Sequence, residues 1–120
     1  MSAPLFDVNL QQLPDEYLTG EWCVTTRVLN RGNPASTLAQ ATRLTLHPDT
    51  MQVHRPGQQD SGQWLVRRDE LLSRPYLELH LLEEETRALI TRLRRSTDGL
   101  QRQLSLYFLS GMELELVCPC

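Results

Sequence analysis

The sequence predicts an all-β protein built as a single eight-stranded antiparallel up-and-down barrel, with a short N-terminal helical or irregular segment. Apolar and polar residues alternate with period two along most of the 120 residues, which is the pattern of half-buried strands. Turn residues separate eight such stretches, and closure into a barrel would leave no strand edge exposed. A sandwich or an open, strongly curved sheet is the alternative. The candidate strands are 22–29, 42–46, 51–53, 63–67, 76–82, 87–95, 100–108 and 112–118.

The chain is long enough for one domain and too short for two. We expect a single barrel over 1–120, with residues 1–18 packing on it and the strands within 19–118. A formal net charge of −3 argues against a nucleic-acid partner. No apolar run approaches the roughly 20 residues of a membrane span. Because no basic region precedes an apolar stretch at the N-terminus, a cytoplasmic location is expected.

The N-terminal segment 4–18 is the one stretch that could hold helix, and Pro14 interrupts it. Its apolar residues could plug the base of the barrel or dock onto another protein. The first strand, 22–29, is rich in β-branched residues.

The middle strands pair through short turns. The Pro48-Asp49 turn pairs Leu46 with Met51 and Leu44 with Val53. In 76–82 the leucines point inward and the residues between them outward, namely Leu77, Leu79 and Leu81 against Tyr76, Glu78 and His80. The run Glu83-Glu84-Glu85 then forms a charged turn.

Two turns set the register of the last three strands. Asp98-Gly99 is typical of a two-residue type I′ hairpin loop, and Leu109-Ser110-Gly111 suits a three-residue loop with Gly111 left-handed. Both registers give a continuous apolar inner face. The first pairs Leu93 with Leu104, Thr91 with Leu106, Leu89 with Phe108 and Arg95 with Arg102; the second pairs Phe108 with Met112, Leu106 with Leu114, Leu104 with Leu116 and Arg102 with Cys118.

Gly20-Glu21-Trp22 stands at the head of the first strand. The arrangement resembles the lipocalin and calycin-like superfamily of small β-barrels, in which a Gly-x-Trp motif opens the first strand. The resemblance implies that Trp22 packs at the closed base beneath an arginine from a late strand, either Arg102 or its neighbour Arg95. The superfamily includes ligand carriers, bilin-handling lyases and proteins with no known ligand.

Arg95 and Arg102, directly opposite each other, form the first candidate site. Facing cations are unfavourable unless an anion or an aromatic ring lies between them. One interpretation is therefore an anion or carboxylate site completed by Trp22 and Thr91. The alternative is that one arginine packs over Trp22 while the other extends into solvent.

Cys23, Cys118 and Cys120 cannot all pair within one chain, and we expect reduced thiols. Closure would bring Cys23 near the other two, and Arg102 would favour the thiolate of Cys118. All three are candidate reactive thiols. Three thiolates and one further donor could bind zinc, but Cys-Pro-Cys lacks the usual ligand spacing, so neither a metal nor a cofactor is predicted.

No catalytic motif is present, so an enzyme is not predicted; a lyase role would follow from the resemblance alone. The chain has no Lys, which excludes lysine Schiff-base chemistry. The connection 30–41 is either a lid over the open mouth or a plain surface loop.

Two functional hypotheses follow, for a monomer or a homodimer. The favoured one is a small intracellular lipocalin-like module that binds a small, mostly apolar or amphipathic molecule, with or without an anionic group. The other is a filled barrel that acts as a protein-interaction or assembly factor, which the bulky inward residues suit. Its candidate surface is Arg92, Arg94 and Tyr107, flanked by Glu113 and Glu115.

Overall fold

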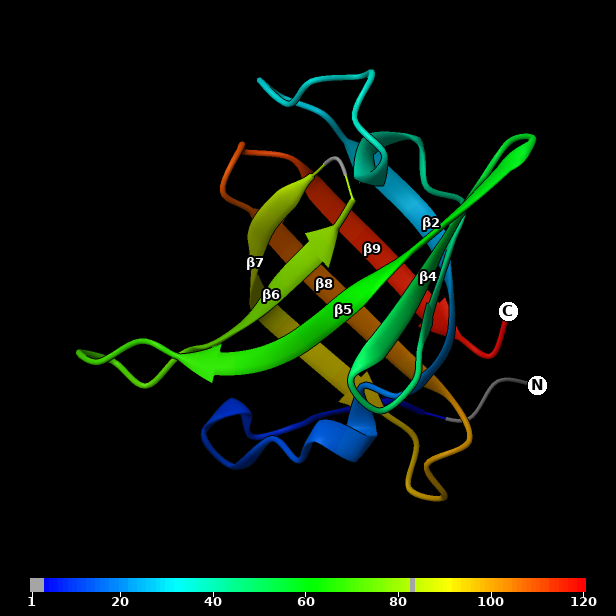
Figure 1. Ribbon diagram of the computed structural model, residues 1–120. Coiled ribbons are helices and arrows are strands. Elements are labelled where there is room, and N and C mark those ends of the chain that lie inside the picture. Colours follow the sequence, from blue (N-terminus) through cyan, green and yellow to red (C-terminus); the bar gives the residue numbers. More distant parts are fainter. Residues whose placement is uncertain (1–3, 83) are drawn as a thin grey trace.

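The computed structural model describes residues 4–82 and 84–120, in nine strands and three 3-10 helices (Figure 1). Residues 1–3 of the expected N-terminal segment and Glu83 of the expected charged turn lie outside the described residues. The strands are β1 (Phe6–Asp7), β2 (Gly20–Val28), β3 (Arg43–Leu46), β4 (Thr50–Arg55), β5 (Gln58–Arg68), β6 (Pro75–Leu81), β7 (Glu85–Arg95), β8 (Arg102–Phe108) and β9 (Glu113–Cys118). The 3-10 helices are η1 (Leu10–Gln12), η2 (Asp15–Tyr17) and η3 (Leu38–Gln40).

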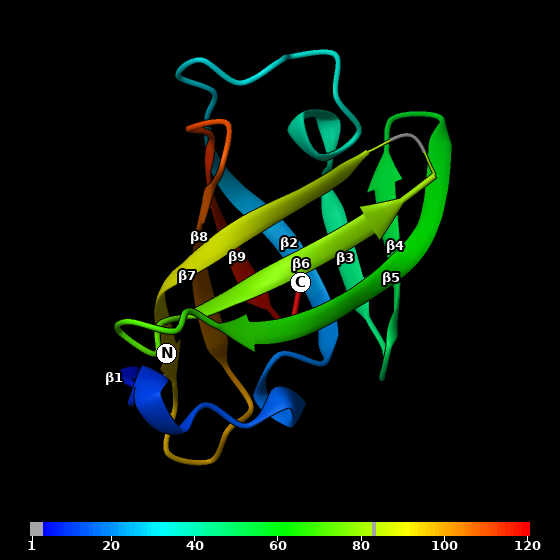
Figure 2. The same ribbon diagram turned by 60° about the vertical axis from the view of Figure 1, so that its left-hand side comes forward.

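Strands β2 to β9 form a closed antiparallel barrel (Figures 1 and 2). Each pairs with its neighbour in sequence, and β9 pairs with β2 to close the ring. The predicted eight-stranded up-and-down barrel is therefore confirmed. Strand β1 is an addition that pairs with the end of β7, with Phe6 opposite Arg95. Two residues are too few to carry a periodic signal, so β1 was not predicted.

Most of the predicted registers are confirmed. In the β8–β9 hairpin Leu106 lies opposite Leu114 and Arg102 opposite Cys118. Gly111 has a φ of 96°, the left-handed conformation that its three-residue loop requires. The β3–β4 pairing follows the Pro48-Asp49 prediction, and β6 alternates buried leucines with half-buried outer residues as expected.

The register predicted for β7 is wrong over the N-terminal half of the strand, because β7 carries a β-bulge between Ile90 and Arg92. Ile90, not Thr91, pairs with Leu106, and Ala88, not Leu89, pairs with Phe108. One extra residue transfers every side chain before it to the other face of the sheet. Thr91 and Leu89 are therefore on the outside of the barrel.

The β7–β8 connection also differs from the predicted two-residue loop. The backbone N–H of Ser96 donates to the carbonyl of Gln101 over 2.9 Å, so four residues lie between them. Gly99 is left-handed, with φ 75°, but Asp98 does not have the positive φ that a type I′ turn needs. Instead the Asp98 carboxylate accepts hydrogen bonds from the Ser96 hydroxyl and the Leu100 N–H, which lower the pKa of Asp98.

The barrel is filled by side chains and closed at both ends. At the base, Leu13 and Leu18 of the N-terminal segment are buried, so this segment plugs the barrel. At the other end, η3 lies over the mouth (Figure 2), and Leu38, Ala39 and Ala41 are buried there. Among the described residues, no helix is both long and apolar enough to cross a membrane.

Candidate functional site

The base of the barrel holds two arginines that each stack on an aromatic ring. Arg95 of β7 and Arg102 of β8 lie opposite each other, as predicted. The guanidinium carbon of Arg102 is 5.0 Å from the centre of the Trp22 ring, and that of Arg95 is 4.3 Å from the Tyr17 ring. Both distances are those of cation–π contacts.

Arg102 ties several segments of the chain together. Its Nη1 donates to the carbonyl oxygens of Tyr17 and Thr19 over 2.6 and 2.8 Å, and its Nη2 donates to Cys118 Sγ over 3.0 Å. Gly20 leaves room for this guanidinium, since a Cβ there would lie 2.6 Å from Nη2. The Gly-x-Trp motif therefore supplies both the ring beneath Arg102 and the space beside it.

Arg95 is also held by the protein. Its Nη1 donates to the hydroxyl of Tyr17 over 3.1 Å. Both arginines are half-buried and each stacks on a ring, so neither is the solvent-extended side chain of the alternative interpretation. The buried Nε atoms of both lack a hydrogen-bond partner among the described residues. Thr91, which was expected beside them, lies on the outer face. Tyr17 was missed because its only signal was membership of the segment expected to plug the base.

Two of the three cysteines form a disulfide, which contradicts the expectation of three reduced thiols. Cys23 lies opposite Val117 where β2 meets β9, and this pairing brings Cys120 to a Cα–Cα distance of 5.2 Å from Cys23. Cys118 is buried and free. Its side chain is on the inner face beside Arg102, whereas Cys23 points outward. In the described part of the chain, no three His, Cys, Asp or Glu residues are placed to hold a metal ion.

Polar side chains hold the loop that covers the mouth. Arg27 donates to the carbonyl of Ala41, and Arg55 donates to Gln40 Oε1 over 3.2 Å and pairs with Asp60 over 2.9 Å. Glu84 Oε1 accepts from the N–H of Leu38 over 3.4 Å. A second bulge, in β2, places Arg27 opposite the inward Leu114. Sequence reasoning missed these residues, because neither the bulge nor the loop contacts leave a periodic signal.

The positive charge of the predicted interaction surface, which contains Arg92, Arg94 and Tyr107, is partly neutralised by the N-terminal segment. Arg92 and Arg94 share the carboxylate of Asp7 at 3.5 and 3.8 Å. Tyr107 lies opposite Leu89 and is 47% exposed. The bulge thus brings an apolar residue beside Tyr107.

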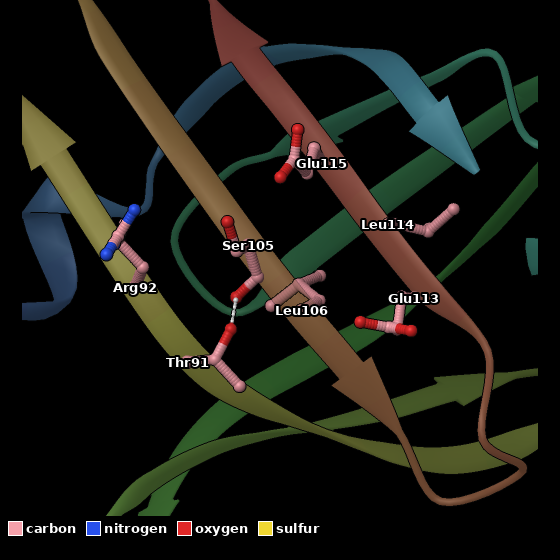
Figure 3. A pocket seen from close by; sticks show the side chains of 7 residues that line it. All are labelled: Thr91, Arg92, Ser105, Leu106, Glu113, Leu114 and Glu115. Carbon is pink, nitrogen blue, oxygen red and sulfur yellow. Dashed lines mark hydrogen bonds between the residues drawn. The ribbon is translucent and has the colours of Figure 1, made fainter. Parts of the chain in front are cut away.

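Two hollows lie on this outer face, and the Leu89–Tyr107 pair lines the second of them. A polar hollow of about 290 Å³ is lined by Thr91, Arg92, Ser105, Leu106, Glu113, Leu114 and Glu115 (Figure 3). An apolar groove of about 330 Å³ is lined by Asp69, Tyr76, Arg87, Leu89, Tyr107, Phe108 and Leu109. Three more hollows lie at the rims or on the outside, and each of the five is lined mainly by residues outside the buried core cluster.

No protein-family model matches this chain, and comparisons with curated proteins and with solved structures find no significant similarity.

Proposed function

We propose that this protein is a filled β-barrel that acts as a binding module for another protein, through the outer face of β6, β7 and β8. The observation that carries the proposal is the row of Tyr76, Leu89 and Tyr107, which lie side by side on three neighbouring strands. Tyr107 is exposed, and Tyr76 and Leu89 are half-buried beside it. Aromatic residues beside an apolar groove are typical of the energetically important part of protein interfaces.

The filled interior supports the same proposal. Every barrel strand contributes residues to one buried cluster, and both ends are covered. A ligand inside would have to displace this packing. At the base, Arg102 is already bound to two backbone oxygens and the Trp22 ring, and Arg95 to the hydroxyl and ring of Tyr17, so both are poorly placed to receive a ligand.

The test is capture of proteins from the source cells by the wild type and by Leu89→Arg, with Val28→Arg as the control. Val28 is an exposed apolar residue on β2, away from this row. We expect a protein that binds the wild type and Val28→Arg but is lost with Leu89→Arg, and that binds directly when purified. If every captured protein binds Leu89→Arg equally well, the proposal is wrong.

The second candidate is the favoured sequence hypothesis, a module for a small apolar ligand. The observation that favours it is the loop over the mouth, which is fastened by the few polar contacts of Arg27, Arg55 and Glu84. If the loop withdraws, Leu38 leaves space above an apolar interior.

Native mass spectrometry of the purified protein decides this candidate. A bound small molecule that is lost on denaturation would support it. We would also titrate the apolar anionic dye anilinonaphthalene sulfonate into the wild type and into Leu38→Ala. A clean protein mass, with no dye uptake by either form, would exclude it.

A further inference from the structure

We infer that the partner presents an extended acidic segment, which places one apolar side chain in the outer groove and carboxylates against the arginines of β7. This inference rests on the proposed function and specifies the chemistry of the partner.

The groove has room for a single large side chain. Tyr76 lies opposite Leu89, and Leu89 opposite Tyr107, so the row crosses three strands and spans about 10 Å at the usual strand spacing. Leu109 bounds one end, since its N–H donates to the carbonyl of Arg87 over 3.0 Å. In the described residues neither tyrosine hydroxyl of this row has a hydrogen-bond partner in the protein, so both are available to peptide carbonyls.

Arg87 stands at this groove without a carboxylate of its own. Its guanidinium carbon is 5.8 Å from the centre of the Tyr76 ring. Within residues 4–82 and 84–120 no carboxylate lies within ion-pair distance of it. Glu78 lies opposite Arg87 but pairs with Arg67 over 3.0 Å and also contacts His80. An external carboxylate is the partner that Arg87 lacks.

Arg92 lies on the other side of Leu89 along the same strand and lines the polar hollow (Figure 3). Its contact with Asp7 is long and is shared with Arg94. Arg87 and Arg92 are five positions apart, which is about 16 Å along a strand. An extended segment of about five residues therefore reaches both arginines, with its apolar side chain between them.

The acidic residues of β9 determine over which strand the partner segment lies. Glu113 lies opposite Tyr107, and Glu115 opposite Ser105, and both line the polar hollow on the side away from β7. Carboxylates of a partner would be repelled there and attracted along β7. Asp69 also lines the apolar groove, so attraction for an acidic segment is confined to Arg87 and Arg92, and the segment is expected to follow β7.

The same arginines argue against a second copy of this chain as the partner. A two-fold contact centred on Leu89 brings Arg87 against Arg87, or Arg87 against Arg92, depending on whether the axis runs along β7 or across it. Like charges facing each other across an interface oppose association.

The experiment is a selection from a random dodecapeptide library displayed on phage. The wild type is compared with Leu89→Arg, Tyr107→Ala and Arg87→Glu, and Arg31→Glu in the exposed mouth loop is the control. Thermal unfolding checks that each variant folds. We expect enriched peptides in which an apolar or aromatic residue is flanked by Asp or Glu. A synthetic peptide of this kind should lose at least tenfold in affinity with Arg87→Glu and change less than twofold with Arg31→Glu. Replacing its acidic residue by Lys should restore binding to Arg87→Glu.

The outcomes separate this inference from the proposed function. Peptides that need Leu89 and Tyr107 but carry no acidic residue, or that bind Arg87→Glu unchanged, would overturn the inference and leave the proposed function standing. Enrichment that never depends on Leu89 or Tyr107 would overturn both. A dimer in sedimentation equilibrium that Leu89→Arg dissociates would assign the surface to a second copy and also overturn the inference.

Discussion

Arg102 joins three distant parts of the chain through one planar group. It covers the Trp22 ring, supplies donors to two carbonyls of the N-terminal segment and contacts Cys118 of the last strand. A guanidinium can do this because its donors point in fixed directions while its faces stay free for stacking. The residue therefore has a structural role at the closed base.

We predict that Arg102→Ala lowers the free energy of unfolding by about 3 kcal/mol, because it leaves two carbonyls without their donor and exposes the Trp22 face. Arg102→Lys keeps the charge but cannot make the same set of contacts, so its loss should be smaller. Urea unfolding of the three proteins measures both effects. An unchanged midpoint for Arg102→Ala would contradict the structural role.

Asp69, at the start of the β5–β6 connection, gives a pH-dependent contribution to stability. Hydrogen bonds from the backbone N–H groups of Leu72 and Arg74 hold the pKa of Asp69 below its ordinary value of 3.8. Because the pKa of Asp69 is lower in the folded state, its contribution to stability is present above pH 3.8. This contribution is lost as the pH falls through the folded-state pKa.

We therefore predict that acidification from about pH 6 to about pH 3 destabilises the wild type more than Asp69→Asn, which cannot titrate. Urea midpoints at the two pH values test this. An equal decrease in both proteins would show that Asp69 is not responsible.

At the scale of elements, the sequence predicted the strands and most hairpin registers, because alternation and turn residues act locally. It could not place the bulge in β7, since Ala88, Leu89 and Ile90 are all apolar and fit either register. The predicted site contained the same error. Thr91 was expected on the inner face beside Arg95 and Arg102, and Leu89 was also expected to point inward. In the structure both lie on the outer face, where Leu89 is part of the proposed binding surface.

The bulge gives a direct prediction for β7. Ile90→Ala should cost about 2–4 kcal/mol, because it removes a fully buried side chain from the core. Thr91→Ala should change stability by less than about 0.5 kcal/mol, because Thr91 is exposed. Thermal or urea unfolding compares the two variants. If Thr91→Ala were the more destabilising of the two changes, the register without a bulge would be the correct one.

The whole molecule is closed twice, by the β2–β9 pairing and by the Cys23–Cys120 disulfide. The sequence separation of the two cysteines is 97 residues. A cross-link over so long a loop is expected to stabilise the fold by up to about 4–5 kcal/mol, chiefly by restricting the unfolded chain. Disulfides are more typical of oxidising compartments than of the cytoplasm.

We predict that the denatured, unreduced protein contains one alkylatable thiol, Cys118, and that reduction raises the count to three. Mass spectrometry after alkylation measures this. Cys120→Ser should lower the unfolding midpoint, whereas Cys118→Ser should leave the disulfide intact. Three thiols in the absence of reductant would contradict the pairing.

The sequence supports a filled core better than it supports a ligand inside the barrel. Large residues occupy the inward positions of β3, β4, β6, β8 and β9 as expected, and eight strands enclose little more volume than such side chains need. What the sequence could not predict was how the ends are closed, because Leu18 and Leu38 belong to irregular segments.

The N-terminal and C-terminal segments of the described chain lie next to each other. Leu5 and Pro119 line the same small hollow beside β8 and β9, while the β4–β5 turn at Pro56-Gly57 extends away from the body (Figure 1). Chains whose termini are neighbours tolerate circular permutation. A permuted protein that begins at Gly57 and ends at Pro56, with a short linker joining the present ends, would keep every strand pairing and would leave the β6–β8 face untouched. New termini at that turn would also offer a point of attachment away from the proposed binding surface.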